Sequence, residues 1–422
     1  MRILVVSNLY PPVQLGGYEA RCAVTSDRLR EWHEVHVLTS TYRRGDAPHD
    51  PSVRRELPFL RHGRRSIPLA PVASAKAMRV MRDTLADVRP DLVFVWNGSA
   101  IPHAALQVAH ESGIPVAYSV GEHWFRLLYS SDAFARFLLP GQHGLRGAWA
   151  RVARLVNRLP ALRVDPLRPA RAAVCWNSDA TRRSSGLPPM ISPTHEVTIY
   201  PGVPEPERWS RLERRPGEKP AIAYVGRVEA VKGPDVAYRA VAELRDRHGV
   251  EARLVLAGSC DTAMRRELDD LADRLRIADL VELRGPLDHA AIGRLLEESH
   301  VLVVPSVWEE PFGIVLLEAA LARVPVVASR SGGMPEALRE GSEARFFEIE
   351  DAAGCADALA ETLRDPAATD ARVAAAYERA NALSFERYIA EMERFVSQAR
   401  ADQRAPASRN NPSMRSATTG AS

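Results

Sequence analysis

Short apolar runs alternate with longer amphipathic stretches along most of this chain. In the first half, apolar runs predict strands at 3–6, 34–39, 91–96, 115–120 and 172–176. Continuous apolar runs are typical of strands covered on both faces, as in a parallel sheet between helices. Helices are expected near 20–30 and 76–88, and the Arg- and Pro-rich residues 43–76 are expected to be irregular.

The second half repeats this pattern with more regular spacing. Strands are predicted at 221–225, 252–257, 280–283, 300–304 and 325–328, and helices at about 234–247, 262–275, 289–298 and 313–322. Strands that alternate with helices of ten or more residues indicate βαβ units. We therefore predict an α/β fold with two Rossmann-like parallel sheets facing each other across a cleft, where open α/β sheets bind ligands.

Length and local composition divide the chain. Its 422 residues exceed one ordinary core and predict two domains. Residues 201–219 are rich in Pro, Glu and Arg, which is typical of a linker. We expect an N-terminal domain at 1–200, a C-terminal domain at 220–384, and a helix at 385–400 that packs back toward the N-terminal domain. Residues 404–422 have the composition of a disordered tail.

Charge is unevenly distributed along the chain. The formal net charge is +3, but residues 1–210 hold 27 Lys and Arg against 18 Asp and Glu, whereas the remainder holds 29 against 35. The first half is therefore the one expected to meet anionic partners, such as phospholipid or an acidic acceptor. The chain contains no recognisable nucleic-acid-binding motif, so a nucleic-acid partner is not expected.

Cysteine usage and hydropathy indicate the compartment. The four cysteines are far apart and form no Cys-x-x-Cys pair, which argues against a zinc site or a disulfide framework and suits a reducing cytosol. The first apolar run is too short for a signal-peptide core, and no run approaches the roughly 18 apolar residues of a membrane span. A cytoplasmic protein is expected, at most peripheral to the inner face of the cell membrane.

The most informative segment is 305–336, which follows an apolar run. Because Pro311 pushes the preceding residue out of the α region, Glu310 is expected on a loop at the end of a strand. A helix is expected to open near 312–313 and to contain Glu318. Free N–H groups and the helix dipole at such an N-terminus predict an anion site. Carboxylates beside it suit a ligand that also carries hydroxyls, as a sugar nucleotide does.

A second block, GRVEAVKG at 226–233, follows the predicted strand 221–225. Its first glycine permits a tight turn and close approach of the backbone to a ligand. Arg227 offers a planar fork for bidentate phosphate contact, and Lys232 offers a compact positive charge. Together the two blocks predict cations for a diphosphate and carboxylates for sugar hydroxyls.

The combination GR…KG, EPFG…E and GG.PE resembles the family-four retaining glycosyltransferases of group 1 type, with the GT-B architecture. The likeness covers about residues 1–395. It implies transfer of a hexosyl unit from a nucleoside diphosphate sugar, a UDP or GDP sugar, to a hydroxyl acceptor such as a glycan, glycolipid or secondary metabolite. No Asp-x-Asp motif ends a predicted strand, so metal-assisted stabilisation of the leaving group is not expected. The sugar nucleotide is expected as a substrate, and no resident cofactor is expected.

The resemblance also implies roles for single residues. Arg227 and Lys232 would hold the diphosphate and neutralise it as it leaves. Glu310 would contact the donor sugar, and Glu318 would accept hydrogen bonds from the ribose diol. Backbone N–H groups would cap the distal phosphate at Phe312, Gly313 and Ile314.

Other positions of the resemblance are less specific. Gly16 and Gly17 stand where the family has a glycine-rich loop facing the phosphate and acceptor. His123 matches the family's cleft histidine and would contact the donor sugar or support charge near the reacting carbon. Ser178, after Asn177, stands where the family often has a cleft-lining serine. Gly258 belongs to a loop expected to approach the base.

Other interpretations remain open. A sugar-nucleotide epimerase of the same architecture would release product without an acceptor. A non-catalytic sugar-nucleotide binder would be expected to lack the cations or the glutamates, yet all are present. A dinucleotide-dependent oxidoreductase would need a G-x-G-x-x-G turn after the first strand, and the loop NLYPPVQLGGYE lacks it.

A final feature is the segment 145–159, LRGAWARVARLVNRL. Apolar residues recur at helical spacing at Leu145, Trp149, Val152, Val156 and Leu159, with arginines on another face at Arg151, Arg154 and Arg158. A basic amphipathic helix with Trp on its apolar side is typical of a membrane interface. The alternative is a helix that packs its apolar side inward and exposes its cations.

Overall fold

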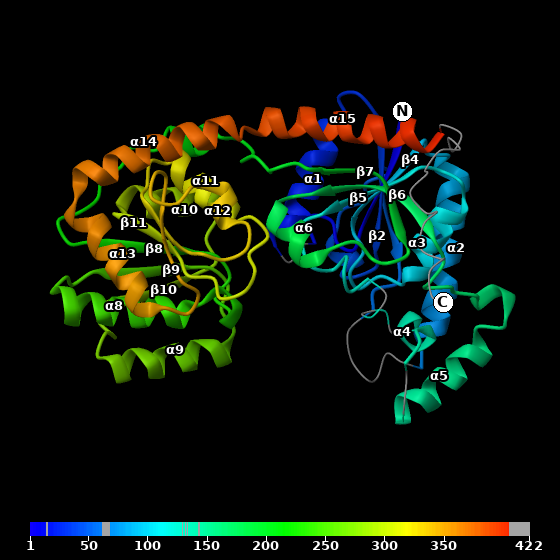
Figure 1. The fold of residues 1–422 in the computed structure, drawn as a ribbon, viewed down its shortest axis with the longest axis horizontal. Coiled ribbons are helices and arrows are strands. Elements are labelled where there is room, and N and C mark those ends of the chain that lie inside the picture. Colours follow the sequence, from blue (N-terminus) through cyan, green and yellow to red (C-terminus); the bar gives the residue numbers. More distant parts are fainter. Residues whose placement is uncertain are drawn as a thin grey trace, which may run out of the picture.

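The computed structural model describes residues 1–13, 16–60, 68–128, 130, 132, 134–141 and 144–404. Within these ranges the chain forms two parallel sheets flanked by helices (Figure 1). The predicted α/β class with two parallel sheets is confirmed. The tail expected to be disordered lies outside the described residues beyond Arg404. No helix of the described part is long and apolar enough to cross a bilayer.

The first sheet has seven strands in the order β3-β2-β1-β4-β5-β6-β7, all paired in parallel. Its strands are β1 (Arg2–Ser7), β2 (Glu34–Ser40), β3 (Val53–Leu57), β4 (Leu92–Asn97), β5 (Val116–Val120), β6 (Ala170–Trp176) and β7 (Ile191–Thr198). The accompanying helices are α1 (Gly17–Leu29), α2 (Ala70–Val88), α3 (His103–Glu111), α4 (Ala135–Leu138), α5 (Gly144–Val156) and α6 (Asp179–Ser185). The central strands are buried on both faces, as their continuous apolar runs predicted.

The second sheet has six strands in the order β10-β9-β8-β11-β12-β13. Its strands are β8 (Ala221–Val225), β9 (Arg253–Ala257), β10 (Val281–Gly285), β11 (Val301–Val304), β12 (Val326–Ser329) and β13 (Arg345–Phe347). The helices of this half are α7 (Glu207–Ser210), α8 (Pro234–His248), α9 (Thr262–Leu275), α10 (His289–Glu298), α11 (Ile314–Leu321), α12 (Met334–Ala337), α13 (Ala352–Arg364) and α14 (Pro366–Ala382).

The prediction that residues 43–76 are irregular was wrong. They contain β3, which pairs in parallel with β2, and the first turns of α2, which begins at Ala70. β3 is a half-exposed edge strand with the sequence VRREL, so it lacks the apolar run that marks a buried strand. Strands β7 and β13 were also missed: β7 is a largely part-exposed edge strand, and β13 has only three residues.

The last helix, α15 (Phe385–Arg404), returns to the first half of the chain. Figure 1 shows it running from α14, above the second sheet, across to the first sheet. Its buried residues, including Tyr388, Met392 and Phe395, belong to the core of the first sheet. The rings of Phe395 and Phe94 lie 6.3 Å apart. The helix therefore joins the second half of the chain to the core of the first half.

Candidate functional site

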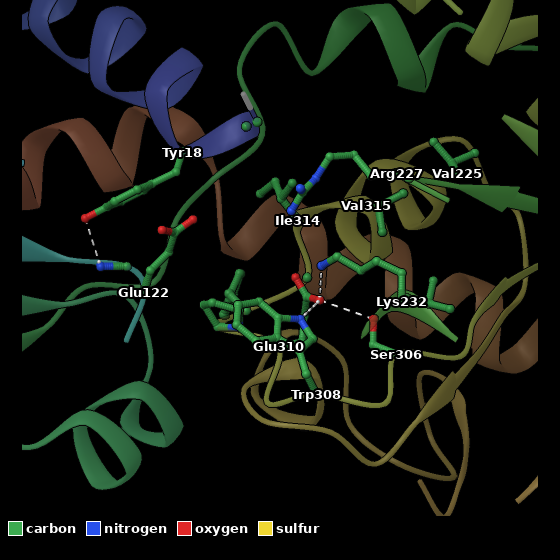
Figure 2. A pocket seen from close by; sticks show the side chains of 18 of the residues that line it. Tyr18, Glu122, Val225, Arg227, Lys232, Ser306, Trp308, Glu310, Ile314 and Val315 are labelled. Carbon is green, nitrogen blue, oxygen red and sulfur yellow. Dashed lines mark hydrogen bonds and ion pairs between the residues drawn. The ribbon is translucent and has the colours of Figure 1, made fainter. Parts of the chain in front are cut away.

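A cavity of about 500 Å³ lies between the two sheets. Both halves contribute to it, and Figure 2 shows the side chains that line it. The first half supplies Gly16, Gly17, Tyr18, Arg21, Gly121, Glu122 and Asn177, and the second supplies, among others, Arg227, Lys232, Ser306, Trp308, Glu310, Gly313 and Ile314. A cavity of this size can enclose a small molecule.

Glu310 is held at the centre of the second half's wall by three donors. The Nζ of Lys232 lies 2.5 Å from its Oε2, Ser306 Oγ lies 3.2 Å away, and Trp308 Nε1 lies 3.3 Å away (Figure 2). The side chains of Lys232 and Glu310 are 19% and 15% exposed, so the ion pair is largely removed from water. The loop position predicted for Glu310 is confirmed, since it precedes α11 and lies outside any helix.

The Gly332-Gly333 pair holds the backbone of Glu310 in place. The backbone N–H of Gly333 donates to the Glu310 carbonyl at 2.7 Å. A Cβ on Gly332, whose φ is +54°, would lie 2.1 Å from the same carbonyl oxygen. Glycine is therefore required here by both conformation and space, which explains the GG.PE block in physical terms.

The GRVEAVKG block follows β8 and forms part of the cavity wall. Gly226 and Arg227 line it, and the guanidinium of Arg227 pairs with Glu229 at 2.7 Å. Gly258, predicted near the base, is not among the described residues that line the cavity. Its φ is +159°, and a Cβ there would meet the Gly226 carbonyl oxygen at 1.7 Å. Gly258 thus permits the close packing of two strand ends beside the cavity.

Helix α11 begins where its sequence predicted. Gly313 has φ +80° and precedes Ile314, the first helical residue, and both line the cavity. Phe312 is buried and stacks on Tyr200, with ring centroids 5.6 Å apart. The helix N-terminus is therefore fixed with its free N–H groups at the cavity, an arrangement that favours a bound anion.

Glu318 lies inside α11, as predicted, but it is not among the described residues lining the cavity. Burial raises its pKa to about 7, and the positive charges of Arg21 and Arg208 oppose that rise. Arg21 belongs to the first half and lines the cavity, so Glu318 is placed near the boundary between the halves.

The facing wall begins at the N-terminus of α1. Gly16 and Gly17 line the cavity, and the Gly16 N–H donates to the Glu19 carboxylate at 3.1 Å. Tyr18 fixes this turn to the sheet, because its hydroxyl lies 2.5 Å from the Trp96 carbonyl oxygen. The structure thus brings the predicted glycine pair opposite Arg227, Lys232 and Glu310.

His123 lies in an adjoining pocket rather than in the lining of the main cavity. This pocket also contains Ser184, Glu309 and Glu310. The His123 ring meets Trp308 edge-on, with centroids 5.6 Å apart, and its Nε2 lies 3.6 Å from a Glu309 carboxylate oxygen. His123 therefore stands behind Trp308, one side chain away from the main cavity.

Glu122, next to His123, is the site residue that the sequence analysis missed most clearly. It lines the main cavity, and Figure 2 shows its carboxyl pointing into it. Burial raises its pKa to about 7, and Glu19 adds to the rise, whereas Arg227, Lys232 and Arg21 oppose it. The signal was present, since Glu122 lies two residues after the strand whose end indicated His123. Trp308 and Ser306 were also missed, although they lie in the segment that defined the site.

The raised pKa of Glu122 predicts a pH-dependent stability difference. In the unfolded chain the Glu122 carboxyl ionises above its ordinary pKa of 4.5, whereas in the folded protein it stays protonated up to about pH 7. Folding then takes up a proton, so Glu122 costs stability as pH rises through this window. We expect the melting temperature of Glu122→Gln to equal that of the wild type at about pH 4. Between about pH 5 and 7.5 it should exceed the wild-type value by a margin that grows with pH.

Melting curves by differential scanning fluorimetry across this pH range would measure the difference. Glu218→Gln, at an exposed position, is the matched control and is expected to track the wild type at every pH. Parallel curves for Glu122→Gln and the wild type would contradict the raised pKa.

The potential metal ligands of the described residues do not indicate a metal centre. Among the described residues, no group of three or more His, Cys, Asp or Glu side chains is placed to hold a metal ion. The cavity lining instead combines the cations Arg21, Arg227 and Lys232 with two carboxyl groups, those of Glu122 and Glu310.

Comparison with known proteins agrees with this geometry. Residues 206–379 match the family model described as glycosyl transferases group 1. A glycogen synthase of Mycobacterium tuberculosis is 30% identical over 405 residues, which cover 90% of this chain and 90% of that protein. The chain belongs to the group 1 glycosyltransferases. A D-inositol 3-phosphate glycosyltransferase of Thermobifida fusca is 36% identical over 208 residues, 46% of this chain and 48% of that protein.

Solved structures confirm the GT-B architecture of this glycosyltransferase. The HepE protein of Anabaena, in complex with UDP and glucose, matches with a TM-score of 0.64 at 18% identity, over 94% of this chain and 100% of that one. A sucrose-phosphate synthase from Thermosynechococcus elongatus matches with a TM-score of 0.68 at 19% identity, over 95% and 99%. At these identities the likeness concerns the fold.

The two halves of the glycosyltransferase also touch directly beside the cavity. The hydroxyl of Ser178, a predicted cleft residue, is buried and donates to the Pro311 carbonyl at 2.6 Å. The Glu336 carboxylate accepts from the backbone N–H groups of Asp179 and Ala180, each at 2.7 Å. Glu336 thus caps α6 of the opposite half, where a carboxylate is stabilised by the helix dipole.

This cap gives a stability prediction. Glu336→Ala removes the acceptor for two N–H groups of α6, and we expect the free energy of unfolding to fall by about 1 kcal/mol. Urea denaturation followed by circular dichroism would measure it. The control Glu348→Ala removes an exposed ion pair with Arg330 and is expected to change the value by less than about 0.5 kcal/mol. Equal effects of the two changes would contradict the capping role.

Proposed function

We propose that this glycosyltransferase moves a hexosyl unit from a nucleoside diphosphate sugar to a hydroxyl acceptor with retention of anomeric configuration. The observation that carries the proposal is the convergence of Lys232, Glu310 and the N-terminus of α11 on one cavity between the sheets. Cations and free N–H groups there suit a diphosphate, and a carboxylate suits sugar hydroxyls.

A UDP sugar is the proposed donor, with a GDP sugar as the alternative. Support comes from HepE of Anabaena, which is described in complexes with UDP and with UDP-glucose. The base would lie toward the strand ends near Gly258, and the ribose diol would donate to Glu318. Since hydroxyl donors stabilise an ionised carboxylate, donor binding would lower the pKa of Glu318 from about 7.

The proposed chemistry is carried by the leaving group and its surroundings. The bond between the anomeric carbon and the diphosphate oxygen breaks, and its electron pair departs with the diphosphate. Arg227, Lys232 and the N–H groups at 313–314 would stabilise that developing charge without a metal. The acceptor oxygen bonds to the anomeric carbon on the same face, and its proton passes to the departing phosphate oxygen.

The remaining walls would position the sugar and the acceptor. Glu310, fixed by Lys232, Ser306 and Trp308, is proposed to orient the sugar hydroxyls, and Glu122 faces it from the other half. His123 would act from behind Trp308. The acceptor would enter over Gly16 and Gly17, where small residues leave the backbone accessible.

A panel of nucleoside diphosphates and their sugars, scored by thermal shift, is the first test. A ligand that binds the folded protein stabilises it by about 2.7 kcal/mol at 100 times its Kd, and we expect UDP and a UDP hexose to do so. Product analysis by NMR with a simple hydroxyl acceptor would then report retention. Conversion of the sugar nucleotide without an acceptor into an epimer would favour the epimerase, and no shift with any nucleotide would refute the proposal.

A further inference from the structure

Helix α5 exposes several large apolar side chains to solvent. It follows α4 and projects below the first sheet, at the lower right of Figure 1. Three of its large apolar residues are exposed, Trp149 by 45%, Val152 by 51% and Leu155 by 64%, and so is Leu159, three residues beyond its end, by 55%. Contiguous exposed apolar side chains of this size mark an interaction surface.

The packing of α5 differs from the inward-facing helix that was the alternative prediction. Ala150 and Ala153 are the residues buried in the core, and Val156, expected on the apolar stripe, is partly buried against it. Leu155 is exposed in its place. The side chain of Leu145 lies outside the described residues. The small residues of the helix therefore attach it to the protein, while Trp149, Val152 and Leu155 face outward.

The helical wheel separates three stripes. At about 100° per residue, Trp149, Val152 and Leu155 fall within about 120° of the circumference. The buried Ala150 and Ala153 centre about 130° away from them. The exposed Arg151 and Arg154 lie between the two. An apolar stripe is thus bordered by a cationic one on the side open to solvent.

Charge decides which partner fits this surface. Residues 133–164 contain six arginines and neither Asp nor Glu. Two copies of the chain apposed through α5 would bring like charges together, which is unfavourable. A surface of anionic phospholipid instead offers phosphates to the arginines and an apolar layer to the tryptophan and leucines.

We propose that α5 docks this glycosyltransferase onto an anionic bilayer. Trp149, Val152, Leu155 and Leu159 would lie at the boundary of headgroups and acyl chains, with Arg151 and Arg154 at the phosphates. Docking holds the protein in the interface plane without crossing it. The inference goes beyond sugar transfer and stands on the exposed residues of α5, so it can fail while the donor site is correct.

Vesicle flotation with the full chain would test the proposal. Vesicles of phosphatidylcholine with about 30% phosphatidylglycerol are expected to retain the protein at low salt, with a partition coefficient at least about tenfold above that of pure phosphatidylcholine. Because exposed charges are screened, binding should fall steeply by about 0.5 M salt. Equal partitioning to both vesicle types would overturn the proposal.

Matched variants locate the surface. Arg151→Glu/Arg154→Glu is expected to reduce partitioning about tenfold or more, and Val152→Ser/Leu155→Ser several-fold. The controls on α2, Arg79→Glu/Arg82→Glu and Val72→Ser, change equally exposed residues and are expected to bind as the wild type does. Equal losses of vesicle binding in the α2 controls would overturn the proposal. A dimer detected by sedimentation velocity and abolished by the α5 variants would also overturn it.

Nucleotide-induced thermal shifts of the α5 variants serve as the folding check. They are expected to equal those of the wild type, because α5 contributes no residue to the described lining of the cavity. Lost vesicle binding with an intact nucleotide response would assign the effect to the surface rather than to the fold.

Discussion

Lys232→Ala is expected to lower kcat for sugar transfer by about 100- to 1,000-fold, the usual cost of removing one group that stabilises charge in a transition state. The Nζ of Lys232 lies 2.5 Å from Glu310 and is largely shielded from water. Its loss removes a cation from the departing diphosphate and leaves Glu310 without its ion-pair partner. Steady-state kinetics with the donor identified by the nucleotide panel would measure the effect.

Lys219→Ala is the matched control, since Lys219 is exposed and precedes the second sheet. It is expected to leave kcat and donor KM unchanged. Far-ultraviolet circular dichroism and the urea midpoint would establish that Lys232→Ala is folded. Turnover within about threefold of the wild type, with donor at saturation, would remove Lys232 from the proposed mechanism.

Glu310→Gln is expected to lower kcat by about 100-fold or more while the affinity for the nucleoside diphosphate changes only a few-fold. The amide keeps the size of the side chain but loses the charge that pairs with Lys232. If Glu310 orients the sugar, the defect concerns the reaction and the sugar, not the nucleotide. Comparing Kd values for the diphosphate and the sugar nucleotide by calorimetry would separate these contributions.

Glu309→Gln provides the neighbouring control. Glu309 is 61% exposed and points toward His123 in the adjoining pocket, so its replacement is expected to have a much smaller effect on kcat. Equal loss of affinity for the diphosphate and the sugar nucleotide in Glu310→Gln would contradict the role in sugar positioning. It would instead place Glu310 with the phosphate contacts.

Two partly buried glutamates link the protonation of the site to the stability of the fold. Glu122 and Glu318 both have a pKa raised to about 7 by burial, and each is near arginine or lysine side chains that oppose the rise. Carboxyls shielded from water in this way cost stability at neutral pH unless a ligand satisfies them. They are therefore expected to contribute more to ligand binding than to the fold, as perturbed groups in clefts often do.

The local pattern of the chain sufficed for the elements closest to the site. Pro311 and Gly313 predicted that Glu310 lies on a loop and that α11 follows it, because both effects act within one or two residues. The apolar runs likewise predicted the central strands. Edge strands such as β3 were missed, since a strand open to solvent needs no continuous apolar run.

Several features depended on contacts between segments far apart in the sequence. Glu122 faces Arg227 and Lys232 only because the two sheets meet at this cavity. The cap of Glu336 on α6 likewise joins residues 157 positions apart. Periodicity describes which residues share a face of one element, so it carries no information about which two faces come together.

The sequence by itself determined the two-sheet α/β fold, the blocks that carry Lys232 and Glu310, and the amphipathic character of the segment 145–159. Those properties follow from backbone preferences and short-range periodicity. Only the tertiary structure decided that Glu122 enters the cavity, that His123 lies behind Trp308, and that the apolar side of α5 faces outward. Each of these depends on how distant elements pack, because burial and pKa are set by neighbours in space rather than along the chain.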